Sequence, residues 1–255
     1  MIDQALGLRA LATYTKQPVP SASPLAPRIA VMGGKGGVGA TLLASNLALC
    51  GAKEGKRVVF VEADGRYSPF RLARRLEKAL PRGSAADTLL FPTPYGVQVL
   101  SGSAFCEAAH IASPTVWEAI EPITDMVILD MGSATFESVA LPTELVSHFV
   151  IVTAPNVLAV VETYKKIKCV RLQAPNAAIS VLFNALSGEE EVTRFAEQLE
   201  GMARAFLQTA LYYVGTLPRD NPLTGANPTQ NFVVQERPRS SIAKSIRNFY
   251  CILAR

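Results

Sequence analysis

The chain has 255 residues, of which 49% are hydrophobic and 18% are charged, so it can bury the core of one α/β domain. Its formal net charge of +4 permits contact with anionic lipid or nucleic acid but does not by itself indicate either. No signal-peptide pattern opens the sequence and no apolar run reaches about 18 residues, so we expect a soluble, cytoplasmic protein. Widely spaced cysteines argue against disulfides and against a thiolate metal site: Cys50, Cys106, Cys169 and Cys251.

The first 27 residues differ in composition from the rest of the chain. Residues 1–15 predict a short helix, whose start Asp3 can cap. Residues 16–27, KQPVPSASPLAP, contain four prolines and therefore predict an extended linker. We expect residues 1–15 to lie outside the main domain, residues 28–255, although the same composition also fits a frayed terminus.

Beyond the linker, short apolar runs alternate with amphipathic segments. The apolar runs predict strands at residues 28–32, 57–61, 97–100, 126–129, 148–152, 178–182 and 212–214. The segments between them predict helices at residues 41–53, 69–80, 158–172, 189–209 and 240–253. Apolar strands separated by helices indicate an α/β fold, with a mostly parallel central sheet covered by helices on both faces.

A glycine-rich turn joins the first of these strands to the first helix, within IAVMGGKGGVGATLLASNLA at Ile29–Ala48. Its glycines let the backbone approach a phosphate with its N–H groups turned inward, and the positive end of the following helix adds to the anion site. Thr41 is placed to put its hydroxyl on Mg²⁺. We therefore expect this turn to bind the phosphates of a nucleotide through Gly34, Lys35, Gly36, Gly37, Val38, Gly39, Ala40 and Thr41.

The turn departs from the usual phosphate-loop pattern G-x-x-x-x-G-K-[ST]. Ala40 occupies the position of the lysine that contacts the β- and γ-phosphates, and a different lysine, Lys35, stands early in the loop. Because a charge-assisted contact to the phosphates is missing, we expect weakened nucleotide binding and weak or absent ATP hydrolysis.

The early lysine carries a family resemblance. KGGVGAT resembles the loop KGGxGK[ST] of the MinD/ParA group, the deviant Walker A (SIMIBI) P-loop ATPases. The resemblance implies a MinD-like P-loop NTPase fold that binds ATP or ADP with Mg²⁺ and forms a homodimer in the ATP state. It implies that Lys35 reaches across the dimer interface to the partner's nucleotide. Alanine at position 40 is similar to the loop of the TadZ/CpaE pilus-positioning relatives.

Two carboxylates match catalytic positions of the same family. Residues 58–76 resemble its second strand and switch I, where Asp64 matches the carboxylate that orients the attacking water. Glu62 stands where the family usually has aspartate. Asp130, in VILDMGSA, matches the Walker B aspartate, so the resemblance implies that Asp130 and Thr41 hold Mg²⁺.

The base of the nucleotide is assigned by resemblance to two later segments. Asn184 ends the run VLFN and resembles the asparagine that reads the adenine edge. The segment LPRDNPL resembles a loop that lines the base pocket, which implies contacts around Pro218 and Arg219. Residues 153–168 resemble a further family segment, with Asn156 in place of its glutamate.

The opening residues indicate a branch of the family. DQALGLR resembles the D-Q-A-x-x-L-R motif of the FlhG family, also called FleN or YlxH, which controls flagellar number and placement. The resemblance implies that the N-terminal helix stimulates the SRP-type GTPase FlhF and that the body contacts flagellar C-ring and basal-body proteins. Gln4 would orient water in the partner's site, with Asp3 and Arg9 positioning the helix, and a glutamine in this role fits GTPase chemistry.

Other functions fit the sequence less well. A TadZ/CpaE-like polar scaffold predicts an additional receiver-like domain, for which 255 residues leave no room. A ParA-like partitioning ATPase that contacts DNA could use Arg71, Arg74 and Arg75, but a solvated helix face is the simpler interpretation, so nucleic acid is not expected. The scattered cysteines disfavour the nitrogenase iron-protein branch. No triad or metal pattern surrounds His110 or His148.

Residues 240–255 predict a closing helix with Ile242, Ile246, Phe249 and Ile252 at helical spacing. Such a face fits either the domain core or a membrane surface. We favour the core and therefore expect membrane contact to be weak or peripheral, at the inner membrane or the cell pole.

Overall fold

The computed structural model describes residues 26–64, 68–70, 90–101, 114–134, 145–184, 189–218 and 232–254. The predicted helix at residues 1–15, most of the linker and the arginine-rich part of the helix predicted at 69–80 lie outside these ranges.

Within them, eight strands form one sheet in the order β3-β4-β2-β5-β1-β6-β7-β8. The strands are β1 (Arg28–Gly33), β2 (Val58–Glu62), β3 (Leu90–Pro92), β4 (Val97–Ser101), β5 (Met126–Gly132), β6 (His148–Thr153), β7 (Ala178–Asn184) and β8 (Tyr213–Leu217). Every neighbouring pair is parallel except β3 and β4. Strands β2 to β5 lie on one side of β1, with β5 next to it, and β6 to β8 follow on the other side. The carboxyl end of β1 therefore lies at a switch point, where open α/β sheets bind ligands.

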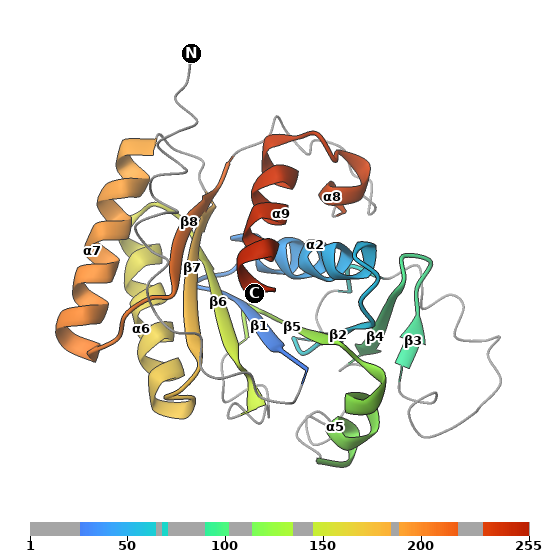
Figure 1. Ribbon diagram of the computed structural model, residues 1–255. Helices are drawn as coiled ribbons and strands as arrows, with labels where there is room; N and C mark the ends of the chain where they lie inside the picture. The colour runs from blue at the N-terminus through green and yellow to red at the C-terminus, as the bar shows by residue number, and fades with distance from the viewer. Residues whose placement is uncertain are drawn as a thin grey trace.

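Helices cover both faces of the sheet, as predicted (Figure 1). One face packs against α2 (Ala40–Lys53), α8 (Val233–Glu236) and α9 (Ser241–Leu253). The other packs against α5 (Pro114–Ile120), α6 (Val157–Gln173) and α7 (Glu189–Leu207), and the 3₁₀ turn η2 (Glu121–Ile123) follows α5. Alternate residues of each central strand enter the two cores, as in β1, where Ile29 and Val31 face α2 while Ala30 and Met32 face α6. The strands are therefore apolar on both faces.

The sequence predicts neither the edge strand β3 nor the short helices α5 and α8. The edge strand β3 has three residues, ends at Pro92 and pairs antiparallel with β4. It is too short to show alternation, and proline in a strand is tolerated only at an edge or a strand end. Helix α5 has seven residues and α8 has four, too few for a helical period to show in the sequence. Several predicted strands end too early, since β5 and β7 continue to Gly132 and Asn184, at the edge that carries the loop.

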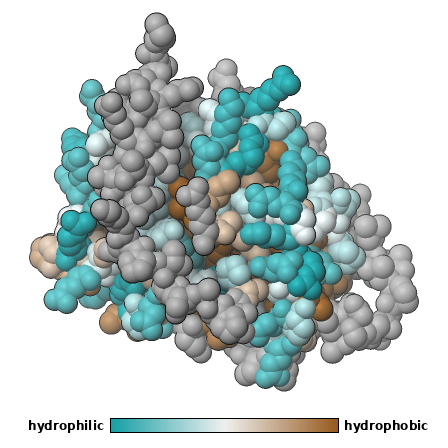
Figure 2. Space-filling model, viewed as in Figure 1, coloured by the Kyte–Doolittle hydropathy of each residue, from teal (hydrophilic) through white to brown (hydrophobic). Residues whose placement is uncertain are grey.

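The closing helix α9 belongs to the core. Ile242, Ile246 and Phe249 are buried against α2 and the sheet, and Ile252 is partly buried. This confirms the preferred interpretation of the C-terminal apolar face. Hydrophilic residues make up most of the visible outer surfaces of α7 and of α8 and α9 (Figure 2), and Phe206, near the end of α7, is an exposed apolar exception. No helix in the described ranges is long and apolar enough to cross a membrane.

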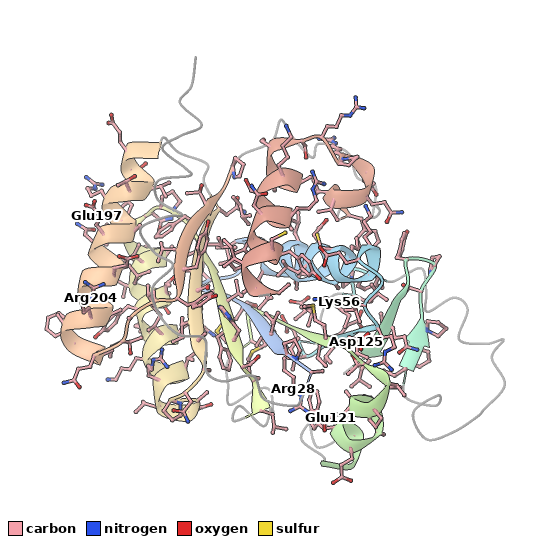
Figure 3. All side chains as sticks on the ribbon, in the orientation of Figure 1. Arg28, Lys56, Glu121, Asp125, Glu197 and Arg204 are labelled. Atoms are coloured by element: carbon pink, nitrogen blue, oxygen red, sulfur yellow. The ribbon has the colours of Figure 1, made fainter. Side chains whose placement is uncertain are left out.

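At the end of the strands opposite the glycine loop, the buried side chain of Arg28 fixes the start of β1. The Arg28 guanidinium lies 3.0 Å from the Glu121 carboxylate and over the ring of Trp117, 5.1 Å from its centroid (Figure 3). These contacts tie α5 and η2 to the central strand, away from the loop.

The buried imidazole of His148 predicts a loss of stability in mild acid. Its Nε2 lies 2.8 Å from Ser180 Oγ, and burial lowers the pKa of His148 from 6.5 to about 3. At a pH between these two pKa values, the unfolded chain therefore binds a proton that the folded chain does not bind. The free energy of unfolding falls as pH falls through this window. Between pH 7 and pH 5 we expect a loss of about 2 kcal/mol from this group.

Urea unfolding at both pH values measures this loss, with His148→Phe as the comparison. The variant lacks the titrating ring, so its stability should change less between pH 7 and pH 5. An equal acid loss in both proteins would show that other groups cause it.

Candidate nucleotide-binding site

The glycine loop lies at the carboxyl edge of the sheet, between β1 and α2. Its start is held by a hydrogen bond in which the Gly34 N–H donates to the Val152 carbonyl at 2.8 Å. The ends of β2, β5, β6 and β7 share this edge, since the strands are parallel and in register. Asp64, Asp130 and Asn184, which were predicted from distant parts of the sequence, therefore lie at the same edge as the loop.

The backbone of the loop needs glycine and leaves room for a ligand. Gly37 and Gly39 have φ angles of 77° and 96°, a left-handed conformation that L side chains rarely adopt. A Cβ at Gly36 or Gly37 would meet nothing within 4 Å, so this part of the loop faces open space. Helix α2 starts at Ala40 with no side-chain cap from Gly39, which leaves the N–H groups of its first turn for an anion.

Thr41 and Asp130 form a polar corner at the end of the loop. The Thr41 hydroxyl donates to Asp130 Oδ1 at 3.1 Å, and the Gly132 N–H donates to the same oxygen at 3.0 Å. Asp130 is 2% exposed, and burial raises the pKa of its carboxyl to about 7, with the nearby Asp64 and Glu62 acting in the same direction. An adjacent cation would favour the ionised carboxylate.

This corner fits magnesium. Mg²⁺ prefers oxygen ligands and is usually bound by one or two carboxylates together with substrate phosphates and water. A hydroxyl and a carboxylate oxygen stand side by side here, next to the loop. Among the residues that the structure describes, no three or more His, Cys, Asp or Glu side chains form a group that could hold a metal by themselves.

Asp64 lies beside Asp130 and contacts the backbone after β5. Its Oδ2 accepts from the Ser133 N–H at 3.2 Å, and its own N–H donates to the Asp130 carbonyl at 3.2 Å. Glu62 pairs in register with Asp130, is buried, and accepts a hydrogen bond from the Ser68 hydroxyl. The sequence did not reveal the partners Ser133 and Ser68, because no local pattern marks them.

The two unusual positions of the loop differ in exposure. The Lys35 side chain is exposed, whereas Ala40 is buried and packs with the core beneath α2. Lys35 is therefore the lysine of this loop that solvent and ligands can reach.

Asn184 contacts the loop directly, since its Nδ2 donates to the Val38 carbonyl at 2.8 Å. Pro218 follows β8, whose Leu217 pairs with Asn184, so Asn184 and Pro218 lie at the same edge. Arg219 lies outside the described residues, as do Asp3, Gln4 and Arg9.

A strand, a glycine loop with an open backbone and a helix, with a threonine and a buried aspartate at the loop's end, define a P-loop NTPase. A family model described as "ParA: NUBPL iron-transfer P-loop NTPase" matches residues 25–253. The chain belongs to the ParA family of P-loop NTPases.

A characterised relative is similar over most of the chain. The chain is 26% identical to the antiactivator FleN of Pseudomonas aeruginosa over 235 residues, which cover 86% of this chain and 83% of FleN. This confirms the predicted resemblance to the FlhG/FleN/YlxH branch of the MinD/ParA group.

Solved structures show the same fold. A ParA family ATPase from Chlorobium tepidum superposes with a TM-score of 0.67 at 17% identity, covering 90% of this chain and 99% of that one. The septum site-determining protein MinD from Pyrococcus horikoshii, complexed with Mg-ADP, gives a TM-score of 0.64 at 17% identity, covering 88% and 94%. The MinD-like fold prediction is confirmed.

Proposed function

We propose that this chain is a MinD-like nucleotide switch that regulates flagellar number and placement and binds ATP or ADP with Mg²⁺. The observation that carries the proposal is the hydrogen bond from Thr41 Oγ1 to Asp130 Oδ1 at the end of an open glycine loop. The N–H groups from Gly36 to Thr41 would bind the phosphates, and Asn184 and Pro218 lie at the same edge for the base. The identity to FleN supports the flagellar role.

The chemistry at this site follows from its side chains. A bound Mg²⁺ would neutralise phosphate charge, held by Thr41 and Asp130. Asp64 holds its carboxylate next to Asp130 and can accept a proton from, or orient, an attacking water. No lysine at position 40 stabilises charge on the phosphates, so hydrolysis should be slow or absent.

Thermal unfolding with and without Mg²⁺ tests the metal corner. A ligand that binds the folded state raises Tm, so ATP should raise the Tm of the wild type more with Mg²⁺ than without it. In Asp130→Asn the Mg²⁺-dependent part of the rise should disappear. Asp125→Asn is the matched control, because Asp125 lies on the surface, paired with Arg57. A full Mg²⁺-dependent rise in Asp130→Asn would remove this residue from the site.

A homodimer in the ATP state is part of the proposal. Lys35 is exposed on the loop, and three apolar side chains are exposed on the first turns of α6, at the same edge of the sheet: Val157, Leu158 and Val161. Adjacent exposed apolar side chains favour a protein interface. The occupant we propose is a second copy of the chain, with its Lys35 reaching the facing nucleotide.

Light scattering with Mg-ATP tests this interface. Leu158→Ser should weaken the dimer about 10-fold or more, since burying a leucine is worth roughly 1.5–3 kcal/mol. Leu172→Ser is the matched control, because Leu172 is as exposed as Leu158, at 74% against 76%, but lies at the other end of α6. Equal effects of the two substitutions, or a dimer that persists in Lys35→Ala, would contradict the arrangement.

The N-terminal motif is the basis for the partner that we propose. We propose that residues 1–15 activate an FlhF-type SRP GTPase through Asp3, Gln4 and Arg9, and that the body contacts C-ring or basal-body proteins. A TadZ/CpaE-like pilus scaffold is the second candidate, favoured by Ala40. A scaffold of this kind needs no GTPase activation, so a measurement of the partner's GTP hydrolysis distinguishes the two candidates.

A further inference from the structure

Gly34, the first residue of the loop, packs against α6 and the end of β6. Gly34 is buried, and a Cβ placed on it would lie 2.5 Å from Thr163 Oγ1 and 3.5 Å from Thr153 Oγ1. No side chain larger than hydrogen fits at position 34 without moving the Thr163 hydroxyl, whereas the distance to the Thr153 hydroxyl is that of an ordinary contact. The loop backbone therefore packs tightly against the Thr163 hydroxyl, and the Thr153 hydroxyl lies next to it.

These two hydroxyls hold each other in place. Thr163 Oγ1 lies 2.7 Å from Thr153 Oγ1 and 2.7 Å from the Ala159 carbonyl, within donating distance of both. Thr153 Oγ1 lies 3.3 Å from the same carbonyl. Both threonines are fully buried, so water does not compete for these bonds.

We infer that Thr163 and Thr153 are positioning residues for the phosphate loop. They set the place of Gly34 and hence the course of Lys35 and the N–H groups that follow. The inference rests on the proposed binding of nucleotide by this loop. It assigns the pair no contact with the nucleotide itself, since Gly34 lies between them and the open part of the loop.

A hydroxyl is required here because of its size and its bonds. A methyl group at the Thr163 oxygen would need a wider contact with Gly34 and could not hydrogen-bond Thr153, so the loop would shift by tenths of an ångström. Hydrogen bonds weaken steeply with such changes in distance and angle. The loop's donors would then meet the phosphates less well.

Thr163→Val and Thr163→Ser test the pair with two measurements. We expect Thr163→Val to raise the dissociation constant of Mg-ATP about 5–20-fold, a loss of roughly one or two hydrogen bonds. It should also speed tryptic cleavage after the exposed Lys35 in nucleotide-free protein, because the loop start is no longer fixed. Thr163→Ser keeps the hydroxyl and should restore both values. Thr153→Val provides the same test should Thr163→Val not fold.

Thr124→Val is the control for a merely structural loss. Thr124 is buried and bonded to the carbonyls of Arg57 and Met126, at the edge of the sheet away from the loop. It should lower stability in urea without changing affinity or cleavage at Lys35. Equal affinity and cleavage in Thr163→Val and Thr124→Val would overturn the inference. A wild type that binds no nucleotide would refute the proposed function, while the cleavage rates would still test the pair.

Discussion

Replacing Ala40 with lysine is expected to tighten binding of Mg-ATP about 10–100-fold. The substitution restores a charge-assisted contact to the phosphates, and such contacts are worth roughly 1.5–3 kcal/mol. Ala40 is the first residue of α2, directly after Gly39, so a flexible lysine stem can run along the loop from this position. Calorimetric titration of both proteins with Mg-ATP measures the difference.

Ala40→Met is the matched control for this gain. Methionine has nearly the length of lysine without its charge, so it reports the effect of bulk at a buried position. It should bind no more tightly than the wild type. Equal affinities of the wild type and Ala40→Lys would show that the missing lysine does not limit binding.

Gln4→Ala is expected to abolish stimulation of an FlhF-type GTPase while leaving the fold unchanged. In GTPases, a glutamine that orients the attacking water contributes a large part of the rate, so its loss should return the partner to its basal rate. The measurement is the partner's GTP hydrolysis rate at increasing concentrations of this chain. Thermal unfolding of the variant checks that the P-loop domain is intact.

Gln17→Ala is the control for this experiment, since Gln17 lies in the proline-rich stretch beyond the motif. It should stimulate like the wild type. Unchanged stimulation by Gln4→Ala would remove Gln4 from the mechanism. Absence of stimulation by the wild type would favour a scaffold of the pilus-positioning kind.

The sheet and the phosphate loop could be predicted because their signals are local. An apolar strand, glycines and a helix stand together within Ile29–Ala48, and the structure has the same elements in β1 and α2. Asp130 could be placed because it follows an apolar run, and parallel strands bring their carboxyl ends to one edge.

Contacts between distant segments could not be predicted in this way. Asn184 bonds to Val38 across 146 positions, and Asp64 to Ser133 across 69. The threonine pair under Gly34 joins three segments, and nothing in its local sequence distinguishes it from ordinary helix and strand residues. The edge strand β3 could not be predicted, because its three residues, which end in Pro92, are too few to show an alternating pattern.

Calorimetric titration of the wild-type chain with Mg-ATP tests most directly whether this chain is a nucleotide switch. Saturable binding in the micromolar range, weakened when Mg²⁺ is removed, is the result we predict for a nucleotide switch built on Gly34–Thr41. Folded wild-type protein that gives no binding heat, with binding restored only in Ala40→Lys, would contradict it. Such a chain would act only through its surfaces and its N-terminal segment.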